Sequence, residues 1–318
     1  MRWPLIRFMP SQTHIDFVRL APFAAVLSGL AILASCVSFY VQGLNEGIDF
    51  AGGTEIQVST PGPAPLGALR GALQKMGEVD PQVVTFGASK NSAMLRFKPS
   101  AGQAADAAAA QVKTNLAGQF PGIQFKQSVA ISAKVSGELF LAGFKALGIA
   151  VLLMLAYIWF RFQLQFGLGA VIALTHDVIL TLGILSALQI EFSTSSIAAL
   201  LTVIGYSMNE KVISFDRLRE NLRKYKTTPL REVINLSENE RLSRTLITGA
   251  SALLALSGTL AMGGPALFPL VFTMAFGIVV GTYSSIYVAL PVILLWGVRR
   301  NDDEIEIIKP QPARFTGR

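Results

Sequence analysis

The sequence predicts a polytopic α-helical membrane protein with six transmembrane helices and one α+β domain of ferredoxin-like topology between helices 1 and 2. Of 318 residues, 52% are hydrophobic and 15% are charged, whereas a soluble domain has about 25% charged residues. Several apolar runs are long enough to cross a hydrocarbon core of about 30 Å. A long polar stretch separates the first two runs. These three observations indicate spans joined by short loops, with one large loop.

The apolar runs place the six spans at 21–41, 137–159, 165–188, 195–215, 244–262 and 268–297. The remaining segments are a cytoplasmic N-terminus (1–20), the large loop (42–136), a basic connector (216–243) and a cytoplasmic tail (298–318). The net charge of +7 gathers at the ends of the apolar runs, which favours membrane orientation over nucleic-acid binding. We therefore expect no nucleic-acid partner.

Basic residues predict the orientation of the chain. Arg19, Arg161, Arg217 and Arg299 flank alternate ends of the spans, while the opposing short loops contain no Lys or Arg. By the positive-inside rule, both termini are cytoplasmic. The first span resembles a lipoprotein signal peptide around Cys36, but its apolar run continues past that residue. This length favours a retained helix over a cleaved signal.

The large loop has its own secondary-structure pattern. The pattern predicts, in order, a strand (54–59), a helix (66–76), two strands (82–86 and 93–97), a helix (103–120) and a strand (123–129), with Pro and Gly at the breaks. The order βαββαβ is that of a ferredoxin-like unit. The loop is long enough to bury a core of its own, but its fold alone names no function.

Ionisable residues inside the predicted spans are the strongest functional signal. Glu210 and Lys211 follow Asn209 near the end of the fourth span, and His176 and Asp177 lie within the third. Charged groups in hydrocarbon cost a few kcal/mol, so they commonly mark a path for protons or substrate. A static buried pair or an interhelical hydrogen bond is the competing interpretation. Because adjacent helical residues do not face each other, His176 and Asp177 cannot both point at one partner.

Two further segments are candidates on weaker grounds. Asp49, Gly52 and Gly53 follow the first span, where glycines permit a sharp turn or hinge; a plain exit turn explains them equally well. Arg244 opens the fifth span and alone reads as an interfacial anchor. Glu240 precedes it by four residues, so the two can form a helical pair.

The remaining sequence gives no sign of enzymatic chemistry. The chain has no phosphate-binding loop, nucleophile motif or metal-ligand spacing, so we expect neither an enzyme nor a cofactor or metal. The basic connector 216–243 is partly amphipathic and could lie on lipid headgroups or a neighbouring subunit, although a solvated loop is the simpler expectation.

Taken together, the motifs resemble the signatures of the bacterial SecF family. The resemblance rests on Gly47–Thr54, Thr175–Asp177, Gly205–Glu210, Phe215–Asn221 and Leu242–Thr245, in that order along essentially the whole chain. It implies a multi-pass protein of the bacterial inner membrane whose large loop is a periplasmic α+β ferredoxin-like domain. The implied function is that of an accessory subunit of the Sec translocase, which uses the proton motive force to complete protein export.

The resemblance also implies partners and residue roles. The expected partners are SecD, the SecYEG channel, YajC, YidC, unfolded preprotein and membrane lipids. Proton coupling falls on Glu210 and Arg244, with Asp177, His176 and Asn209 beside them. Asp49, Gly52 and Gly53 become the periplasmic-exit hinge motif, and Asp216 and Arg217 a cytoplasmic helix-end motif.

The chain departs from the family pattern at two places. Glu210 followed by Lys211 replaces the usual Asp followed by Ser or Thr, and Glu240-Arg241 replaces the usual Gln-Thr. The lysine raises the question whether it pairs with Glu210, Asp177 or the partner subunit. Two rival functions remain: a resistance-nodulation-division-type exporter of small molecules or lipids, and a purely structural subunit of the translocase.

Overall fold

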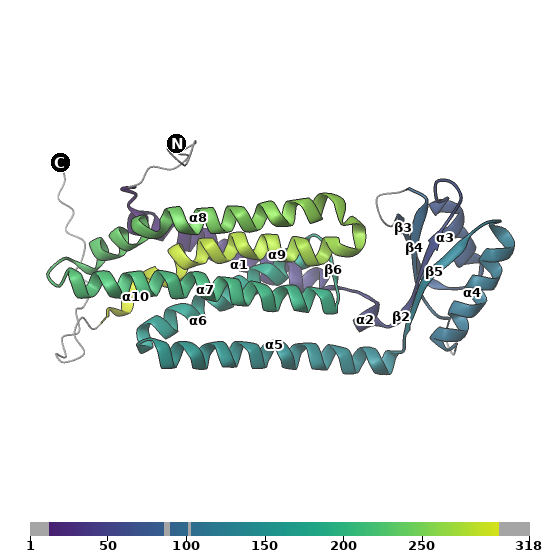
Figure 1. Cartoon of the computed structure of the whole chain (residues 1–318). Coiled ribbons are helices and arrows are strands. Elements are labelled where there is room, and N and C mark those ends of the chain that lie inside the picture. The colour runs from purple at the N-terminus through teal and green to yellow at the C-terminus, as the bar shows by residue number, and fades with distance from the viewer. Residues whose placement is uncertain (1–12, 86–89, 101–102, 299–318) are drawn as a thin grey trace, which may run out of the picture.

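A computed structural model of the chain describes residues 13–85, 90–100 and 103–298. Long helices form a bundle, and a small α/β domain lies beyond one end of it, opposite the end where the first and last described residues lie (Figure 1). Residues 1–12 of the predicted N-terminal segment and all but the first residue of the predicted tail lie outside the described residues.

The predicted spans lie in the long helices of the bundle, and each of these helices begins before the predicted limit. Its long helices are α1 (Phe17–Gln42), α5 (Ala133–Arg161), α6 (Leu164–Ala187), α7 (Thr194–Lys224), α8 (Leu230–Met262) and α9 (Gly264–Ser284). A π-helical turn, η1 (Ser285–Ala289), continues α9 into α10 (Leu290–Trp296). Within the described residues, five helical segments are long and apolar enough to span a membrane, and α7 is not among them. The chain is therefore a multi-pass membrane protein.

The predicted connector 216–243 is helical over most of its length. Helix α7 continues to Lys224, and α8 begins at Leu230. At 1.5 Å per residue these helices are about 46 and 50 Å long, well beyond a 30 Å hydrocarbon core. Their extensions hold together because one face of each is apolar and buried, at Leu218, Leu222, Val233 and Ile234. The amphipathic pattern belongs to a helical hairpin.

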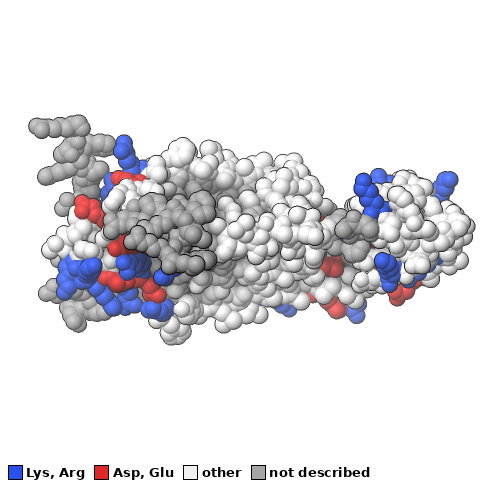
Figure 2. All heavy atoms as spheres, turned by 45° about the horizontal axis from the view of Figure 1, so that its top comes forward, with Lys and Arg blue, Asp and Glu red and all other residues white. Residues whose placement is uncertain are grey.

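The charge distribution matches a membrane-embedded bundle. Figure 2 shows Lys, Arg, Asp and Glu at the end carrying the α7–α8 hairpin and again around the α/β domain, with a nearly uncharged belt between them. Large apolar side chains such as Phe23, Leu30 and Trp159 are exposed on that belt. In water such a surface would be a liability, whereas in lipid it is the expected outside of a bundle.

The domain beyond the bundle has the element order predicted from the sequence. It consists of β2 (Gly53–Ser59), α3 (Leu66–Lys75), β3 (Val79–Thr85), β4 (Ser92–Lys98), α4 (Ala105–Gln119) and β5 (Gln124–Ile131). The strands form an antiparallel sheet in the order β3-β4-β2-β5. Alternate residues such as Ile56 and Leu95 point to a core shared with Leu69 and Leu116 of the helices. The period-2 pattern thus fixes which face is buried.

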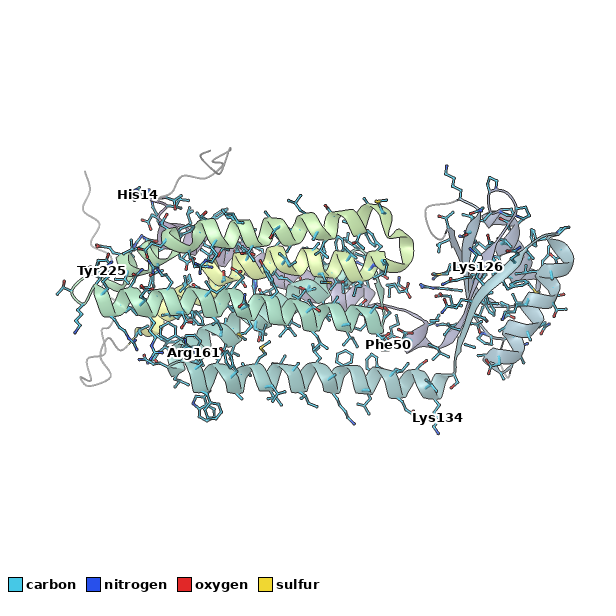
Figure 3. The ribbon with its side chains drawn as sticks, viewed as in Figure 1. His14, Phe50, Lys126, Lys134, Arg161 and Tyr225 are labelled. Carbon is cyan, nitrogen blue, oxygen red and sulfur yellow. The ribbon has the colours of Figure 1, made fainter. Side chains whose placement is uncertain are left out.

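Short elements join the domain to the bundle. β1 (Asn45–Glu46), after α1, pairs in parallel with β6 (Glu191–Phe192), between α6 and α7. The short helix α2 (Ile48–Ala51) follows, and its Phe50 packs on Phe140 and Phe192 with ring centroids 5.5 Å apart. Figure 3 shows Phe50 at the junction, with Arg161 and Tyr225 at the opposite end of the bundle. The junction is therefore packed, and the domain is not on a free linker.

Candidate functional site: two buried charge clusters beside helix α7

Helix α7 presents a polar stripe to the interior of the bundle. Ser207, Glu210, Lys211 and Ser214 are all buried. Their spacing of three, four and seven residues places them on one helical face. Helix α9 approaches α7 closely, since a Cβ on Gly281 would lie 3.0 Å from the Cβ of Ser207. Small residues at such a crossing bring backbones together in membranes, so the stripe meets the polar residues that follow α9.

The first charge cluster is centred on Lys211, whose side chain is 0% exposed. Its Nζ lies 2.8 Å from Oδ2 of Asp177 on α6 and donates to the hydroxyls of Ser207 and Ser284, the latter at 3.0 Å. Ser284 also donates to Asp177 Oδ2 at 2.8 Å. We call His176, Asp177, Ser207, Lys211 and Ser284 the Lys211 cluster. Lys211 thus pairs with Asp177.

His176 extends this cluster to the first helix. Its Nδ1 is 2.9 Å from Asp177 Oδ1, and its Nε2 is 3.2 Å from the Ser28 hydroxyl of α1. Ser28 in turn lies 2.9 Å from the hydroxyl of Tyr283 on α9. The neighbours His176 and Asp177 therefore point at different helices, as their adjacency requires, while their side chains also touch.

The second charge cluster is centred on Arg241 of α8, which is 4% exposed. Its Nε donates to both oxygens of Glu238, at 2.7 and 2.8 Å, and its other nitrogens donate to Thr245 at 2.9 Å and Ser285 at 3.0 Å. The hydroxyl of Ser214 on α7 donates to Glu238 at 2.8 Å. We call Glu210, Ser214, Glu238, Arg241, Thr245 and Ser285 the Arg241 cluster.

Glu210 is the poorly compensated member of the Arg241 cluster. It is 1% exposed, and its Oε2 lies 3.5 Å from Arg241 without a hydrogen-bond partner among the described residues. Arg241 gives its short bonds to Glu238 instead. A buried carboxylate with so little compensation is costly in the ionised form.

The two clusters meet at two pairs of adjacent residues. Glu210 and Lys211 are consecutive on α7, and each enters a different cluster. Ser284 and Ser285 are consecutive where α9 becomes η1, and they contact Lys211 and Arg241 respectively. π-Helical turns are often found at functional sites. Here the turn begins with Ser285, directly after Ser284, so a shift of α7 would disturb both clusters.

Two predicted site residues lie outside these clusters. Arg244 and Asn209 are exposed on the surface of this single chain. Glu240 does not pair with Arg244, because its carboxylate contacts Arg217 at 2.7 Å and Asn221 at 2.6 Å. The arginine that faces Glu210 is Arg241, three residues earlier.

Sequence reasoning missed Glu238 and treated Arg241 only as a departure from the family pattern. The spacing of Glu238 and Arg241, which suits a helical pair, was the available signal. This spacing was not recognised as a pair because both residues fell within the segment expected to be a connector.

The predicted helix-end motif joins helices and does not end one. Asp216 pairs with Arg161 of α5 at 2.9 Å, and Arg217 bridges to Glu240 of α8 and to Glu220. Both residues lie inside α7, which continues to Lys224. They fasten α5 and α8 to α7 at the charged end of the bundle.

The exit motif fastens the domain junction to the start of α7. Asp49 Oδ2 accepts a hydrogen bond of 2.9 Å from the backbone N–H of Thr194, the first residue of α7, which satisfies an otherwise free donor at the helix start. Gly52 and Gly53 have φ of 70° and 141°, where a side chain is strained. A Cβ on Gly53 would also lie 2.9 Å from the carbonyl oxygen of Phe97.

An ion-pair network forms a second attachment at the junction. Arg96 on β4 pairs with Glu191 of β6 and, at 2.8 Å, with Glu55 on β2. Burial by itself lowers the pKa of Arg96, but the charges of Glu191 and Glu55 outweigh it and raise the pKa. The guanidinium therefore stays charged between them. Among the described residues, no group of three or more His, Cys, Asp or Glu side chains has the arrangement of a metal site.

The fold and the buried charges together define a membrane protein in which ionisable clusters sit between helices and an external domain is anchored to them. Comparison with known families agrees. Residues 111–299 match the model of the protein export membrane protein SecD/SecF, C-terminal, and residues 37–60 match that of the SecD/SecF GG motif. The chain belongs to the SecD/SecF family.

Individual relatives cover nearly the whole chain. It is 42% identical over 302 residues to the protein translocase subunit SecF of Cereibacter sphaeroides, covering 93% of both. It is also 42% identical to that of Rhodobacter capsulatus, covering 94% of both. SecDF from Thermus thermophilus, described as a translocon-associated membrane protein, superposes with a TM-score of 0.80 at 28% identity, over 91% of this chain. This chain spans 40% of that longer protein.

Proposed function

We propose that this chain is an accessory subunit of the Sec translocase of the bacterial inner membrane, and that it works with SecD to couple the proton motive force to protein export. The observation that carries the proposal is the state of Glu210. It is buried between helices, its counter-charge is committed to another carboxylate, and one of its oxygens has no hydrogen-bond partner among the described residues.

Counting the charges in the two clusters indicates that Glu210 is the carboxyl group that gains and loses a proton. Lys211 balances Asp177, and Arg241 balances Glu238. Glu210 then remains as one uncompensated negative charge, which burial penalises strongly unless the group takes up a proton. A carboxyl group that gains and loses a proton while buried suits proton coupling.

The Lys211 cluster has a supporting role in this proposal. Asp177 and His176 tie α7 to α6 and α1, because Asp177 binds Lys211 while His176 reaches Ser28. A rotation or slide of α7 that follows protonation of Glu210 would therefore reach α1 through fixed contacts. Such a step biases a packed element between two arrangements.

The same helix supports a route to the external domain. Helix α7 carries Glu210 in its interior and is capped by Asp49 at its first residue. The preceding β6 holds Arg96 of the domain through Glu191. Movement of α7 would thus act directly on the exit motif and the sheet, and the domain would hold or draw the emerging polypeptide by its strand edges.

We assign the architecture in full as six membrane spans with a periplasmic ferredoxin-like domain and cytoplasmic termini. The strand order β3-β4-β2-β5 and the element order βαββαβ support the domain type. Helix α7 supports the sixth span, since it lies within the bundle and buries the polar side chains of Ser207, Glu210, Lys211 and Ser214. The charged end carrying Arg161 and Arg217 supports the orientation.

The proposed partners follow from the same family assignment. SecD is the direct partner, and the exposed Arg244 and Asn209, both on bundle helices, favour a polar contact with another membrane subunit there. SecYEG, YajC and YidC complete the proposed assembly. Unfolded preprotein is the cargo, and lipid covers the exposed apolar belt.

Pulse-chase processing of a secreted precursor in cells carrying Glu210→Gln tests the proposal. We expect processing to slow by about tenfold, corresponding to about 1.4 kcal/mol in the limiting step, and to lose its dependence on the proton gradient. The amounts of this chain and of SecD are measured in parallel, and Glu220→Gln, at an exposed position on the same helix, is the matched control. Normal processing by Glu210→Gln would overturn the proposal.

A structural role is the second candidate, because the Asp177–Lys211 pair is fully buried and has the form of interhelical glue. Under that role Glu210→Gln would slow processing only in proportion to a loss of the complex. Slow processing with normal amounts of both subunits excludes it.

A further inference from the structure

The Arg241 cluster contains two carboxylates and one cation. Glu210 approaches Arg241 from α7, and Glu238 binds it from the same helix, α8. Glu238 holds the guanidinium with short bonds of 2.6 to 2.8 Å, whereas Glu210 lies at 3.5 Å. All three side chains are at most 3% exposed. One guanidinium in such a site can neutralise one carboxylate fully, so the other holds a proton.

The titratable groups around the pair do not change this count. Lys211 and Tyr206 face Glu210 from its own helix, and Tyr287 of η1 faces Glu238. Lys211 is already paired with Asp177 of α6. The tyrosines are neutral near pH 7, since a phenol ordinarily titrates near pH 10.

The geometry points to Glu238 as a second proton-carrying carboxylate, with Arg241 alternating between Glu238 and Glu210. In the arrangement described, Arg241 binds the Glu238 carboxylate and the proton resides on Glu210. In the alternative arrangement, Arg241 binds the Glu210 carboxylate, the Glu210 proton has left, and Glu238 has taken up one proton. The proton count and the net charge of the cluster are the same in both arrangements.

The position of Glu238 gives the transfer a direction. The Ser214 hydroxyl, one helical turn beyond Glu210 on α7, donates to Glu238. Glu238 therefore lies about one turn closer than Glu210 to the charged hairpin end of the bundle, the end shown with Arg161 and Tyr225 in Figure 3. Moving the proton from Glu210 to Glu238 carries it toward that end. The inference rests on the proposed proton-coupled function and adds the second carrier to it.

Infrared difference spectroscopy of this chain with SecD in lipid vesicles at about pH 7 tests the inference. The wild-type protein is expected to show one buried protonated carboxyl band from the pair. Glu238→Gln frees Arg241 for Glu210, so the band is lost although Glu210 is intact. Glu210→Gln also loses the band, because Arg241 and Glu238 then balance each other. Glu232→Gln, at an exposed position in the first turn of the same helix, is the matched control and keeps it.

Arg241→Gln is expected to change the intensity of the carboxyl band in the opposite direction. Without the cation, the two carboxylates have no strong partner, and the band intensity rises toward that of two protonated groups. A variant that accumulates poorly is replaced by Arg241→Lys, which keeps one charge and therefore the wild-type band. Retention of the full band in Glu238→Gln overturns the inference, because Glu210 would then be protonated independently of Glu238.

Export measurements separate this inference from the proposed function. Glu238→Gln is expected to slow precursor processing at normal complex levels, and Glu232→Gln is expected to leave processing normal. If Glu210→Gln loses the band and slows export while Glu238→Gln changes neither, the proposed function stands and the second carrier is excluded. If Glu210→Gln retains the band and exports normally, the proposed function itself fails.

Discussion

At the scale of single residues, the basic residue at the centre of each cluster is paired with a carboxylate. Lys211 is the cation of Asp177, and Arg241 is the cation of Glu238. Each of these two basic residues therefore has a carboxylate within 3 Å. Removing one member of a buried pair leaves an uncompensated charge, which is worth several kcal/mol.

Lys211→Met is expected to destabilise the bundle by roughly 3 kcal/mol, the lower end of the range for breaking a buried pair, because Ser207, Ser284 and His176 still bond to Asp177. Thermal unfolding of the purified chain in detergent measures the loss. The double variant Asp177→Leu with Lys211→Met should recover much of it, since no charge is left unpaired. An unchanged unfolding temperature in the single variant would contradict a stabilising pair.

At the scale of elements, the external domain has a core of its own. The buried residues of its sheet and two helices pack on one another and form a cluster separate from those of the bundle. The domain also buries one carboxylate, that of Glu78, which lies between α3 and β3 and is 6% exposed. Its Oε2 has no hydrogen-bond partner among the described residues. Burial raises the pKa of Glu78 above its ordinary value of 4.5.

Glu78→Gln is expected to stabilise the isolated domain, residues 53–131, by about 1 kcal/mol at pH 7, because a neutral amide costs less to bury than an ionised carboxylate without a hydrogen-bond partner. A raised pKa means that the folded domain binds more protons than the unfolded chain. The contribution of Glu78 therefore favours folding below pH 4.5 and is lost as the pH rises through the raised pKa. The variant should lack this loss.

Thermal unfolding by circular dichroism across pH 4 to 7 provides the measurement for Glu78. Asp106→Asn, at an exposed position in the first turn of α4, is the control and should give no gain. A larger loss of stability with rising pH in Glu78→Gln than in wild type would contradict the assignment.

At the scale of the whole molecule, α7 is the element that the other parts share. It contacts α5 through Asp216, α6 through Lys211 and α8 through Arg217 and Ser214. Its first residue is capped by Asp49 of the exit motif. The preceding strand β6 completes the link to the external domain through Glu191. A displacement of this helix would therefore change contacts at both ends of the bundle, at Asp216 and Arg217 and at Asp49.

Arg96→Gln is expected to loosen the junction, because it removes the charge that Glu191 and Glu55 share. Amide hydrogen exchange at β1 and β6 should become roughly fivefold faster, corresponding to about 1 kcal/mol of local stability. Lys98→Gln, an exposed cation on the same strand, is the control. Unchanged exchange in Arg96→Gln would show that the β1–β6 pairing alone holds the domain.

The sequence by itself was enough to predict apolar helices that can span a membrane, the order of elements in the external domain and the residues that carry the family resemblance. These follow from local rules: apolar run length, period-2 alternation, and turn residues at the breaks. Glu210, Asp177 and His176 were also identified, because an ionisable residue within an apolar run is conspicuous without any knowledge of its neighbours.

Only the tertiary structure decided which charges meet. Arg241 and Arg244 are three residues apart on α8, and the rotation of that helix against α7 buries Arg241 beside Glu210 and leaves Arg244 exposed. The same packing pairs Lys211 with Asp177 and Arg217 with Glu240. Pairing between helices depends on how each helix is rotated and how closely it approaches its neighbour. The rotation and the approach of each helix are set by close contacts between residues that lie far apart along the chain, such as Gly281 and Ser207.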